Sequence, residues 1–255
     1  MKLATWNVNS LKVRLPQVID WLGSNQPDML CLQETKLIND NFPERELAAI
    51  GYQSFFAGQR TYNGVAILSK HQGSEVVTGI PDFADEQKRV IAATYGDLRV
   101  VSVYVPNGED VTSEKFTYKL RWLPALTKWL QQELKQYPKL ALLGDFNIAP
   151  EDRDVYDPKA WEGKVLCSQP ERNAFNGLIE LGLSDSFRLF EQPEKSYTWW
   201  DYRMMAFRLN RGLRIDHILL SRELASSCIS CTIDKTMRKQ ERPSDHAPVM
   251  VELGT

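Results

Sequence analysis

Six short phrases of the chain place a polar side chain at the end of an apolar, strand-like run. They are Thr5-Trp6-Asn7-Val8-Asn9, Leu32-Gln33-Glu34-Thr35, Tyr104-Val105-Pro106-Asn107, Gly144-Asp145-Phe146-Asn147, Arg214-Ile215-Asp216-His217 and Ser244-Asp245-His246-Ala247-Pro248. A rigid sheet presents polar groups to one cleft in this way. Carboxylates gathered in a cleft repel one another, so a divalent cation is the natural reason to gather them. The phrases together predict one polar, metal-dependent site.

Two of these phrases place carboxylates after runs that look fully buried. Glu34 closes the run 29–33, where a carboxylate is costly unless it is paired or metal-bound; the alternative is a glutamate that simply emerges into solvent. Asp145 and Asn147 follow the run 140–144, and their spacing puts both side chains on one face of an extended segment. Such a pair can share one phosphate-bound water, the carboxylate accepting its proton and the amide fixing its orientation. The alternative for this pair is an ordinary turn.

The three histidines of the chain differ in how well they suit a catalytic site. Asp216 and His217 are neighbours in a strand-like run and must point to opposite faces, so we assign Asp216 to the site and His217 to a structural role. His71 lies in a Lys-His-Gln-Gly turn, which predicts a surface position. His246, which follows Asp245, is therefore the candidate imidazole of a phosphoryl-transfer site, and a plain loop is the alternative for this phrase.

Strands dominate the elements that must position these groups. Strand-like runs cover about residues 2–8, 28–33, 52–57, 63–69, 74–78, 88–95, 98–105, 139–144, 212–220, 226–233 and 246–253. Helical spacing occurs at about 15–22, 113–136 and 170–182. Gly and Asn turns between short strands predict antiparallel hairpins, and helices between separate sets of strands predict two sheets packed face to face with helices outside. The segments 148–168 and 191–212 are too irregular to assign.

The size and composition are those of one globular domain spanning residues 1–255. No linker or shift in composition divides the 255 residues. No apolar run approaches the roughly 20 residues of a membrane span, and the N-terminus reads as a strand rather than a signal peptide. We therefore expect a cytoplasmic protein with no membrane partner. The net charge of -2 argues against a protein that coats nucleic acid by bulk charge, but it does not exclude an enzyme that acts on nucleic acid.

Basic residues and cysteines give weaker signals. Two basic clusters, each also explained by a solvated surface loop, consist of Arg203, Arg208, Arg211 and Arg214, and of Lys235, Arg238, Lys239 and Arg242. Cys228 and Cys231 have CxxC spacing, but residues three apart in a strand face opposite sides of a sheet. No second pair completes a zinc site, so we predict neither a metal nor a redox role for these two cysteines.

The complete set of phrases resembles the bacterial exonuclease III-type branch of the apurinic/apyrimidinic (AP) endonucleases, within the deoxyribonuclease I-like group of metallophosphoesterases. The resemblance extends from about residue 1 to 253. Three further phrases that carry it are Asn63-Gly64-Val65-Ala66-Ile67, Trp199-Trp200-Asp201-Tyr202-Arg203 and Asn210-Arg211-Gly212-Leu213-Arg214-Ile215-Asp216. The last two are typical of the DNA-repair branch. The resemblance implies a four-layered α/β sandwich, with two mainly antiparallel sheets face to face and helices on both outer faces.

The resemblance also implies a metal site. Glu34 would hold Mg²⁺, for which Mn²⁺ would substitute, with Asp245, Asn7 and Asn9 as further ligands or close neighbours. Position 9 is Asn where some relatives carry an acid, so metal binding would depend more heavily on Glu34.

The implied catalytic roles fit the chemistry of the residues. Asp145 would orient and deprotonate the attacking water, and Asn147 would help to hold water or phosphate. His246 and Tyr104 would donate to phosphate oxygens, and Asp216 would orient the imidazole. The metal would neutralise charge on the departing 3′ oxygen, which leaves a 3′-hydroxyl and a 5′-phosphate.

The implied substrate is duplex DNA with abasic sites, nicks, or recessed or blocked 3′ ends, bound by a monomer. Trp199, Leu213 and Ile215 would line a pocket for an abasic deoxyribose turned out of the duplex. Arg203 would enter the DNA stack or hold its backbone, and Asn107 would contact DNA. Core packing is the alternative for the tryptophans.

Two other functions remain open at this level. A related phosphoesterase that acts on a lipid or inositol phosphate would share most catalytic phrases, although the phrases at 197–216 and the lack of an apolar membrane-binding loop argue against it. A non-catalytic binding module on the same scaffold would be expected to have lost part of the site, whereas this chain retains every catalytic phrase.

Overall fold

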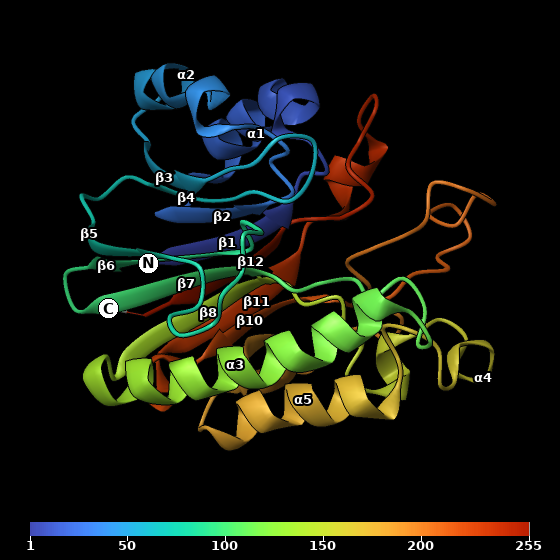
Figure 1. Ribbon diagram of the computed structural model, residues 1–255. Coiled ribbons are helices and arrows are strands. Elements are labelled where there is room, and N and C mark those ends of the chain that lie inside the picture. Colours follow the sequence, from blue (N-terminus) through green and yellow to red (C-terminus); the bar gives the residue numbers. More distant parts are fainter. Residues whose placement is uncertain (255) are drawn as a thin grey trace.

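Two six-stranded sheets pack face to face and form the centre of the molecule (Figure 1). The computed structural model describes residues 1–254. The first sheet runs in the order β11 (Cys228–Ile233), β12 (Val249–Leu253), β1 (Lys2–Asn7), β2 (Met29–Gln33), β4 (Val65–Ser69) and β3 (Gln53–Ala57). The second runs in the order β5 (Ser74–Thr78), β6 (Val90–Tyr95), β7 (Leu98–Tyr104), β8 (Lys139–Asp145), β10 (Asp216–Leu220) and β9 (Ser184–Asp185).

Helices cover the outer face of each sheet, which confirms the four-layered α/β sandwich (Figure 1). The first sheet carries α1 (Leu11–Asn25) and α2 (Glu44–Ala49), and the second carries α3 (Glu114–Gln136) and α5 (Gln169–Glu180). Shorter elements are α4 (Pro158–Trp161), α6 (Arg222–Ser226) and the 3-10 turns η1 (Asn39–Asn41), η2 (Asp152–Asp154), η3 (Ser186–Leu189) and η4 (Lys235–Lys239). Each predicted strand-like run contains a strand; β9 is an additional short strand.

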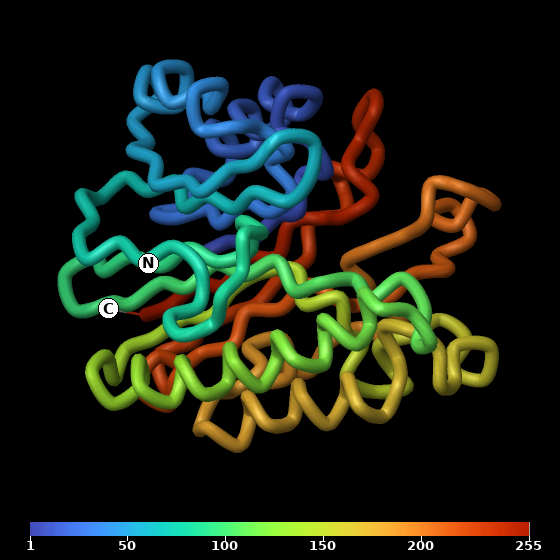
Figure 2. Tube along the Cα trace, viewed as in Figure 1, coloured from blue at the N-terminus to red at the C-terminus, as the bar shows by residue number. Residues whose placement is uncertain are grey.

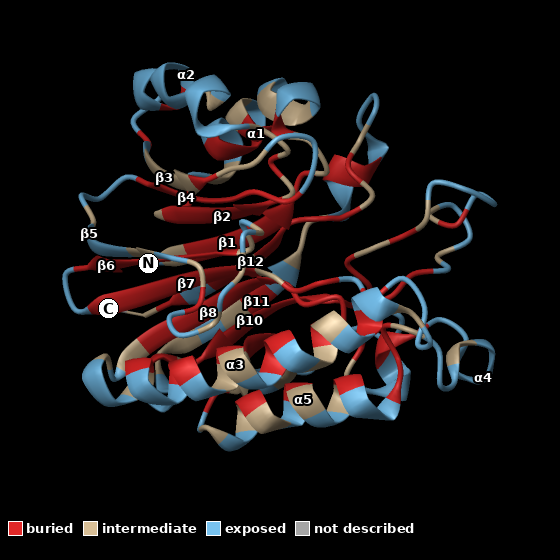
Figure 3. Cartoon of the chain, viewed as in Figure 1, coloured by how far each residue is buried: buried red, intermediate tan, exposed pale blue. Residues whose placement is uncertain are grey.

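Continuous apolar runs form the central strands because these strands are buried on both faces. Every residue of β2 and β4 is buried, and so is every residue of β6. One side of each sheet faces the other sheet, and the opposite side packs under helices. Figure 3 shows this layering, with buried strands inside and exposed surface on the outer sides of the helices. The rigid core therefore fixes the positions of the strand ends.

Two parallel strand pairs bring the polar phrases to one edge. β1 pairs in parallel with β2, and β7 pairs in parallel with β8, connected by α1 and α3 respectively. The carboxyl ends of these four strands therefore point the same way within each pair. β10 runs antiparallel to β8, so its first residue, Asp216, lies opposite Asp145, the last residue of β8. In the first sheet, β12 lies on the other side of β1 and pairs with it antiparallel.

Three local expectations are wrong. A β-bulge between Cys228 and Ser230 breaks the alternation of β11, so Cys228 and Cys231 both pack against the core between the sheets, as free thiols. Arg214 is not a surface cation, because it is 1% exposed and ion-paired with buried carboxylates. Arg238 is also buried, with its guanidinium against the Trp200, Tyr202 and Phe207 rings.

No helix among residues 1–254 combines the length and the apolar character needed to cross a bilayer.

A fully buried ion pair joins the two outer helices of the second sheet to the loops at the site edge. Lys119 of α3 and Glu171 of α5 are both 0% exposed, with Nζ 2.5 Å from Oε1. Lys119 also donates to the backbone carbonyls of Asn107 and Asn147. Glu171 accepts the hydroxyl of Ser168 and two backbone N–H groups. All of the charge in this pair is therefore satisfied inside the protein.

Breaking one side of this pair should destabilise the protein strongly. We expect Lys119→Met to lower the free energy of unfolding by about 3–5 kcal/mol, because Glu171 is left as an uncompensated buried charge. The double variant Lys119→Met/Glu171→Leu should lose less than the sum of the two single variants. Urea unfolding followed by circular dichroism measures each value. Lys128→Met, an exposed position on the same helix, is the matched control, and additive losses in the double variant would contradict the coupling.

Candidate active site

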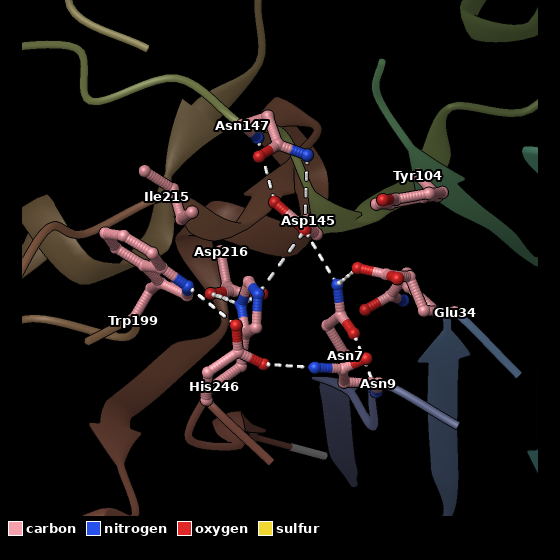
Figure 4. Close-up of polar contacts among 12 residues, drawn as sticks. Asn7, Asn9, Glu34, Tyr104, Asp145, Asn147, Trp199, Ile215, Asp216 and His246 are labelled. Atoms are coloured by element: carbon pink, nitrogen blue, oxygen red, sulfur yellow. Dashed lines mark hydrogen bonds and ion pairs between the residues drawn. The ribbon is translucent and has the colours of Figure 1, made fainter. Parts of the chain in front are cut away.

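The Asn7 amide joins the two sheets at the edge where the parallel strands end (Figure 4). Its Nδ2 donates to Glu34 Oε1 at 2.9 Å and to Asp145 Oδ2 at 2.8 Å. Asn7 is 0% exposed, so its N–H groups are fixed in direction by the core around β1. One amide thereby holds two carboxylates side by side, one from each sheet.

Asp145 and Asn147 lie side by side as predicted, but not because the segment is extended. Asn147 adopts a left-handed backbone with φ 49°, which brings its backbone N–H to Asp145 Oδ1 at 2.9 Å. Its Nδ2 donates to Val105 O at 3.0 Å and lies 3.3 Å from Asp145 Oδ2. Asn107 is exposed, and its Nδ2 donates to Asn147 Oδ1. The amide of Asn147 is therefore held in one orientation beside the carboxylate.

The environment of Asp145 makes it a base near neutrality. Burial and the charge of Asp216 together raise the pKa of Asp145 to about 7, although the charge of His246 acts in the opposite direction. A carboxylate with such a pKa can accept a proton from water far better than an ordinary aspartate can. Its position opposite Asp216 follows directly from the pairing of β8 with β10.

His246 and Asp216 form a buried pair next to Asp145. Nδ1 of His246 lies 2.8 Å from Asp216 Oδ2, and its Nε2 lies 3.7 Å from Asp145 Oδ2. Burial alone would lower the pKa of His246, but the charges of Asp216 and Asp145 outweigh it and raise the pKa to about 10. The imidazole is therefore cationic, with both ring nitrogens as donors, and it is suited to bind an anionic oxygen rather than a metal.

His217 points to the opposite face, as its place in the strand predicts. Its Nε2 lies 2.9 Å from Ile148 O and its Nδ1 lies 3.0 Å from Arg214 Nη1. Burial lowers the pKa of His217 to about 4. This histidine is a neutral structural residue that fastens β10 to the segment after β8.

The acidic groups fit a hard divalent cation. Ligand atoms of Glu34, Asp145 and His246 lie within 4.8 Å of one another. Of these, the two carboxylates are the oxygen ligands that Mg²⁺ prefers. Asp245 does not join this group; its Oδ2 accepts the Trp199 indole N–H and its Oδ1 accepts from Asn9 Nδ2, both at 2.9 Å. In this structure Asp245 orients Trp199, and its predicted part in metal binding stays a prediction.

Tyr104 borders a groove of about 850 Å³. Tyr104 lies across the site from Trp199 (Figure 4). The Arg89 guanidinium lies 4.8 Å from the centre of the Tyr104 ring. Burial raises the pKa of Tyr104 well above its usual value, and the charge of Glu34 adds to the effect. The phenol therefore keeps its proton and can donate it in a hydrogen bond.

An apolar cluster lies behind Trp199. Leu213 and Ile215 are almost fully buried, at 0% and 1% exposure, and Trp199 packs against them half-buried. Isolated backbone bridges pair Trp199 with Leu213 and with His246, so its backbone is held between the segments that lead into β10 and β12. Of the three predicted pocket residues, only Trp199 presents surface in this structure.

A loop beyond Trp199 stands out from the body of the molecule; Figure 2 shows it as the orange excursion near residues 200–212. Arg203 lies on this loop with its side chain 84% exposed, and it pairs with Asp201 at 2.8 Å. Met204 and Met205 beside it are 79% and 62% exposed. Arg203 is therefore free to reach a large ligand.

Two hydroxyl residues that sequence reasoning missed hold the catalytic groups in place. Ser244 Oγ donates to Asn7 O at 2.6 Å and accepts from the backbone N–H of His246. Thr198 Oγ1 accepts the backbone N–H groups of Ile215 and Asp216. Both residues directly precede a predicted site residue, and Ser244 also belongs to one of the six polar phrases, but the sequence indicated neither role.

The segment that carries Glu34 is strained and held from both sides. Glu34 and Lys36 have positive φ values of 50° and 55°, which non-glycine residues rarely adopt. Thr35 N donates to Gly64 O and Lys36 N donates to Asn63 O, while Glu34 O accepts from Ser10 N. Strain of this kind persists only where the surroundings enforce it, and it is common at functional sites.

Comparison with known proteins gives consistent matches over the whole chain. The Endonuclease/Exonuclease/phosphatase family matches residues 4–246. Exodeoxyribonuclease III of Haemophilus influenzae is 37% identical over 266 residues, which cover 99% of this chain and 100% of that protein. A 3′ phosphatase from Neisseria bound to product DNA hairpin superposes with a TM-score of 0.98 at 49% identity, over 100% of both chains. An AP endonuclease from Archaeoglobus fulgidus gives a TM-score of 0.96 at 38% identity, with the same coverage.

Gly64 should be essential for the position of Glu34. A Cβ at Gly64 would lie 2.2 Å from Thr35 Oγ1, and its φ is +92°. We expect Gly64→Ala to displace the Glu34 segment and to reduce kcat/KM for phosphodiester hydrolysis about tenfold or more, since small misplacements of catalytic groups are costly.

Gly51→Ala is the matched control, because Gly51 has a similar φ of +88° and nothing within 4 Å of its Cβ position. It should cost about 1–2 kcal/mol of unfolding free energy from the left-handed backbone alone and leave hydrolysis intact. Urea unfolding and steady-state kinetics separate the two effects. Equal activity of the two variants would show that the contact with Thr35 does not control the site.

Proposed function

Because the chain belongs to the Endonuclease/Exonuclease/phosphatase family, we propose that it is a metal-dependent phosphodiesterase that acts on duplex DNA in DNA repair. It would hydrolyse the phosphodiester 5′ to an abasic site, remove nucleotides or blocking groups in the 3′→5′ direction, or do both. The observation that carries the proposal is the buried Asp216–His246 pair with Asp145 beside it, on the same edge as Glu34. The names of the similar proteins support the choice of DNA as substrate.

The residues divide the work of in-line hydrolysis between them. Glu34 would hold Mg²⁺ or Mn²⁺, with Asn7 as a close neighbour. When bound, the ion supplies positive charge to the departing 3′ oxygen. Asp145 accepts the proton of the attacking water, and Asn147 fixes the orientation of that water or of the phosphate.

Two donors stabilise the charge that develops on the phosphate. The imidazolium of His246 donates from Nε2, because Asp216 occupies its Nδ1. Tyr104 donates its phenol hydrogen from the opposite side of the cleft, as its raised pKa allows. The products are a 3′-hydroxyl and a 5′-phosphate.

Trp199 is the proposed selector for abasic sites. Its indole lies next to the catalytic groups, anchored through Nε1 to Asp245. A deoxyribose without a base could turn out of the duplex and pack on this ring, with Leu213 and Ile215 behind it. Arg203, on the protruding loop, would enter the DNA stack or hold its backbone. Asn107 would also contact the DNA.

We further propose that the protein works as a monomer in the cytoplasm, where bacterial DNA lies. No particular contact favours a lipid or inositol phosphate as substrate, and the intact catalytic set argues against a non-catalytic module.

One gel tests the proposal. A duplex with an internal abasic site and a duplex with a recessed 3′ end are incubated with the protein in Mg²⁺, in Mn²⁺ and in EDTA. We expect cleavage of at least one duplex with either metal and none in EDTA. Full activity in EDTA, or no activity on either duplex, would refute the assignment.

The same gel tests the role of Trp199. Trp199→Ala removes the ring and the bond to Asp245, whereas Trp199→Phe keeps an apolar face and loses only the N–H donor. If the ring packs on the extruded sugar, cleavage at the abasic site should fall more in Trp199→Ala than digestion of the recessed end does. The phenylalanine variant should retain most of the abasic-site activity. An unchanged rate of abasic-site cleavage in a folded Trp199→Ala protein would contradict the role of Trp199 in selecting abasic sites.

Asp145 and His246 should contribute to the same chemical step. We expect Asp145→Asn to lower kcat by ~10²–10⁴-fold, the usual effect of losing a positioned base, while DNA binding holds or tightens. His246→Asn should lower kcat through loss of a donor to the phosphate. The double variant should lose less than the product of the two single losses, because both groups act on one transition state. Single-turnover kinetics at saturating DNA gives these values, and fully multiplicative losses would mean independent action.

A further inference from the structure

An ammonium group lies inside the candidate metal site. Lys36 Nζ is 3.0 Å from Glu34 Oε2 and donates to Asn9 Oδ1 at 2.5 Å. The two oxygens of Glu34 therefore face different partners, since Oε1 accepts from Asn7 on the side of Asp145. The Lys36 and Glu34 side chains are only 27% and 18% exposed, so this is not an open surface pair.

Asn9 extends this contact to a second carboxylate. Its Oδ1 accepts from Lys36 and its Nδ2 donates to Asp245 Oδ1 at 2.9 Å. Glu34 and Asp245, the two acids that the sequence assigns to metal, are thus connected through one ammonium and one amide. An amide can make both bonds because it carries a donor and an acceptor, whereas a carboxylate at position 9 could not donate to Asp245.

The backbone delivers Lys36 to this position. Lys36 and Asn9 both have left-handed φ values, of 55° and 42°. Lys36 N is fixed to Asn63 O, and Asn9 N is fixed to Asn7 Oδ1. The ammonium is therefore directed toward Glu34 by the same strained segments that position the carboxylate itself.

We propose that Lys36 is a resident cation that occupies the space between Glu34 and Asp245 and limits the site to one divalent ion. The inference rests on the proposed metal-dependent function. A divalent ion then binds on the Oε1 side of Glu34, toward Asn7 and Asp145. The positive charge of Lys36 weakens that binding and excludes a second ion from the Oε2 side, because like charges at this range repel strongly. It also compensates Glu34 when no ion is bound.

Mn²⁺ binding in the absence of DNA tests the proposal directly. Titration followed by electron paramagnetic resonance gives the number of ions and their affinity without any need for activity. We expect one Mn²⁺ per chain in the wild type. Lys36→Met should bind one Mn²⁺ more tightly, on the order of tenfold, because the competing charge is gone. Lys36→Met combined with Asn9→Asp should bind two.

Two controls isolate the charge of Lys36. Lys36→Arg keeps the charge and the same backbone requirement, so its Mn²⁺ affinity should stay near that of the wild type. Lys128→Met removes an exposed lysine on α3, away from the site, and should change nothing. If Lys36→Met does not fold, as judged by circular dichroism, Lys36→Gln removes the charge while keeping a polar partner for Asn9, with the same expectation.

Each contrary result has a distinct meaning. Wild-type protein that binds two Mn²⁺ ions would overturn the inference, and so would an unchanged affinity in Lys36→Met. If Lys36→Met alters KM for DNA but not Mn²⁺ affinity, Lys36 is a phosphate contact and the inference fails while the proposed function stands. Wild-type protein that binds no Mn²⁺ would overturn the proposed function together with this inference.

Discussion

Mutual repulsion of carboxylates is the constraint on which the site depends. Four of them approach one edge of the sandwich, at Glu34, Asp145, Asp216 and Asp245. Each has a partner supplied by a different part of the chain. The Asn7 amide bridges two of them, the imidazolium of His246 pairs with a third, and the Trp199 indole holds the fourth. These partners allow the four acids to lie close together, and the burial and repulsion that remain are seen at Asp145, whose pKa is raised to about 7.

The two sheets make this arrangement possible because each contributes ligands on rigid strand ends. Asn7 leaves the first sheet and Asp145 leaves the second, and a single side chain spans the distance between them. Since packed interiors hardly deform, the spacing of the two sheets sets the spacing of the catalytic groups. The loops after these strands then add what strands cannot, namely left-handed turns at Glu34 and Asn147 that turn side chains back into the cleft.

Periodicity predicted the strands, the long helices and the packing of two sheets, because burial on one or both faces leaves a direct pattern in the sequence. It also placed Asp216 and His217 on opposite faces correctly. It failed where partners come from distant segments. The burial of Arg214 depends on Asp154 and Asp185, and the common face of Cys228 and Cys231 depends on a bulge. A pattern of residue types shows which groups are costly to bury, but not which remote group compensates them.

The same limit applies within the site. The polar phrases predicted that the groups would converge, and the resemblance supplied their roles. Neither indicated that Asn147 would turn left-handed, or that Asp245 would accept hydrogen bonds from Trp199 and Asn9. Lys36 follows directly after the predicted phrase around Glu34, and only the structure reveals that its ammonium lies on that carboxylate.

The place of β12 in the first sheet has a consequence for synthesis of the protein. β12 lies between β1 and β11, so the first strand along this sequence pairs with the last one, Lys2 opposite Glu252. The segment just before β12 carries Asp245 and His246, and Ser244 ties that segment to Asn7. Until β12 has left the ribosome, β1 lacks one of its two neighbouring strands, and the His246 imidazole is missing from the cleft. The pairing of these remote strands therefore makes the site complete only after both have been synthesised.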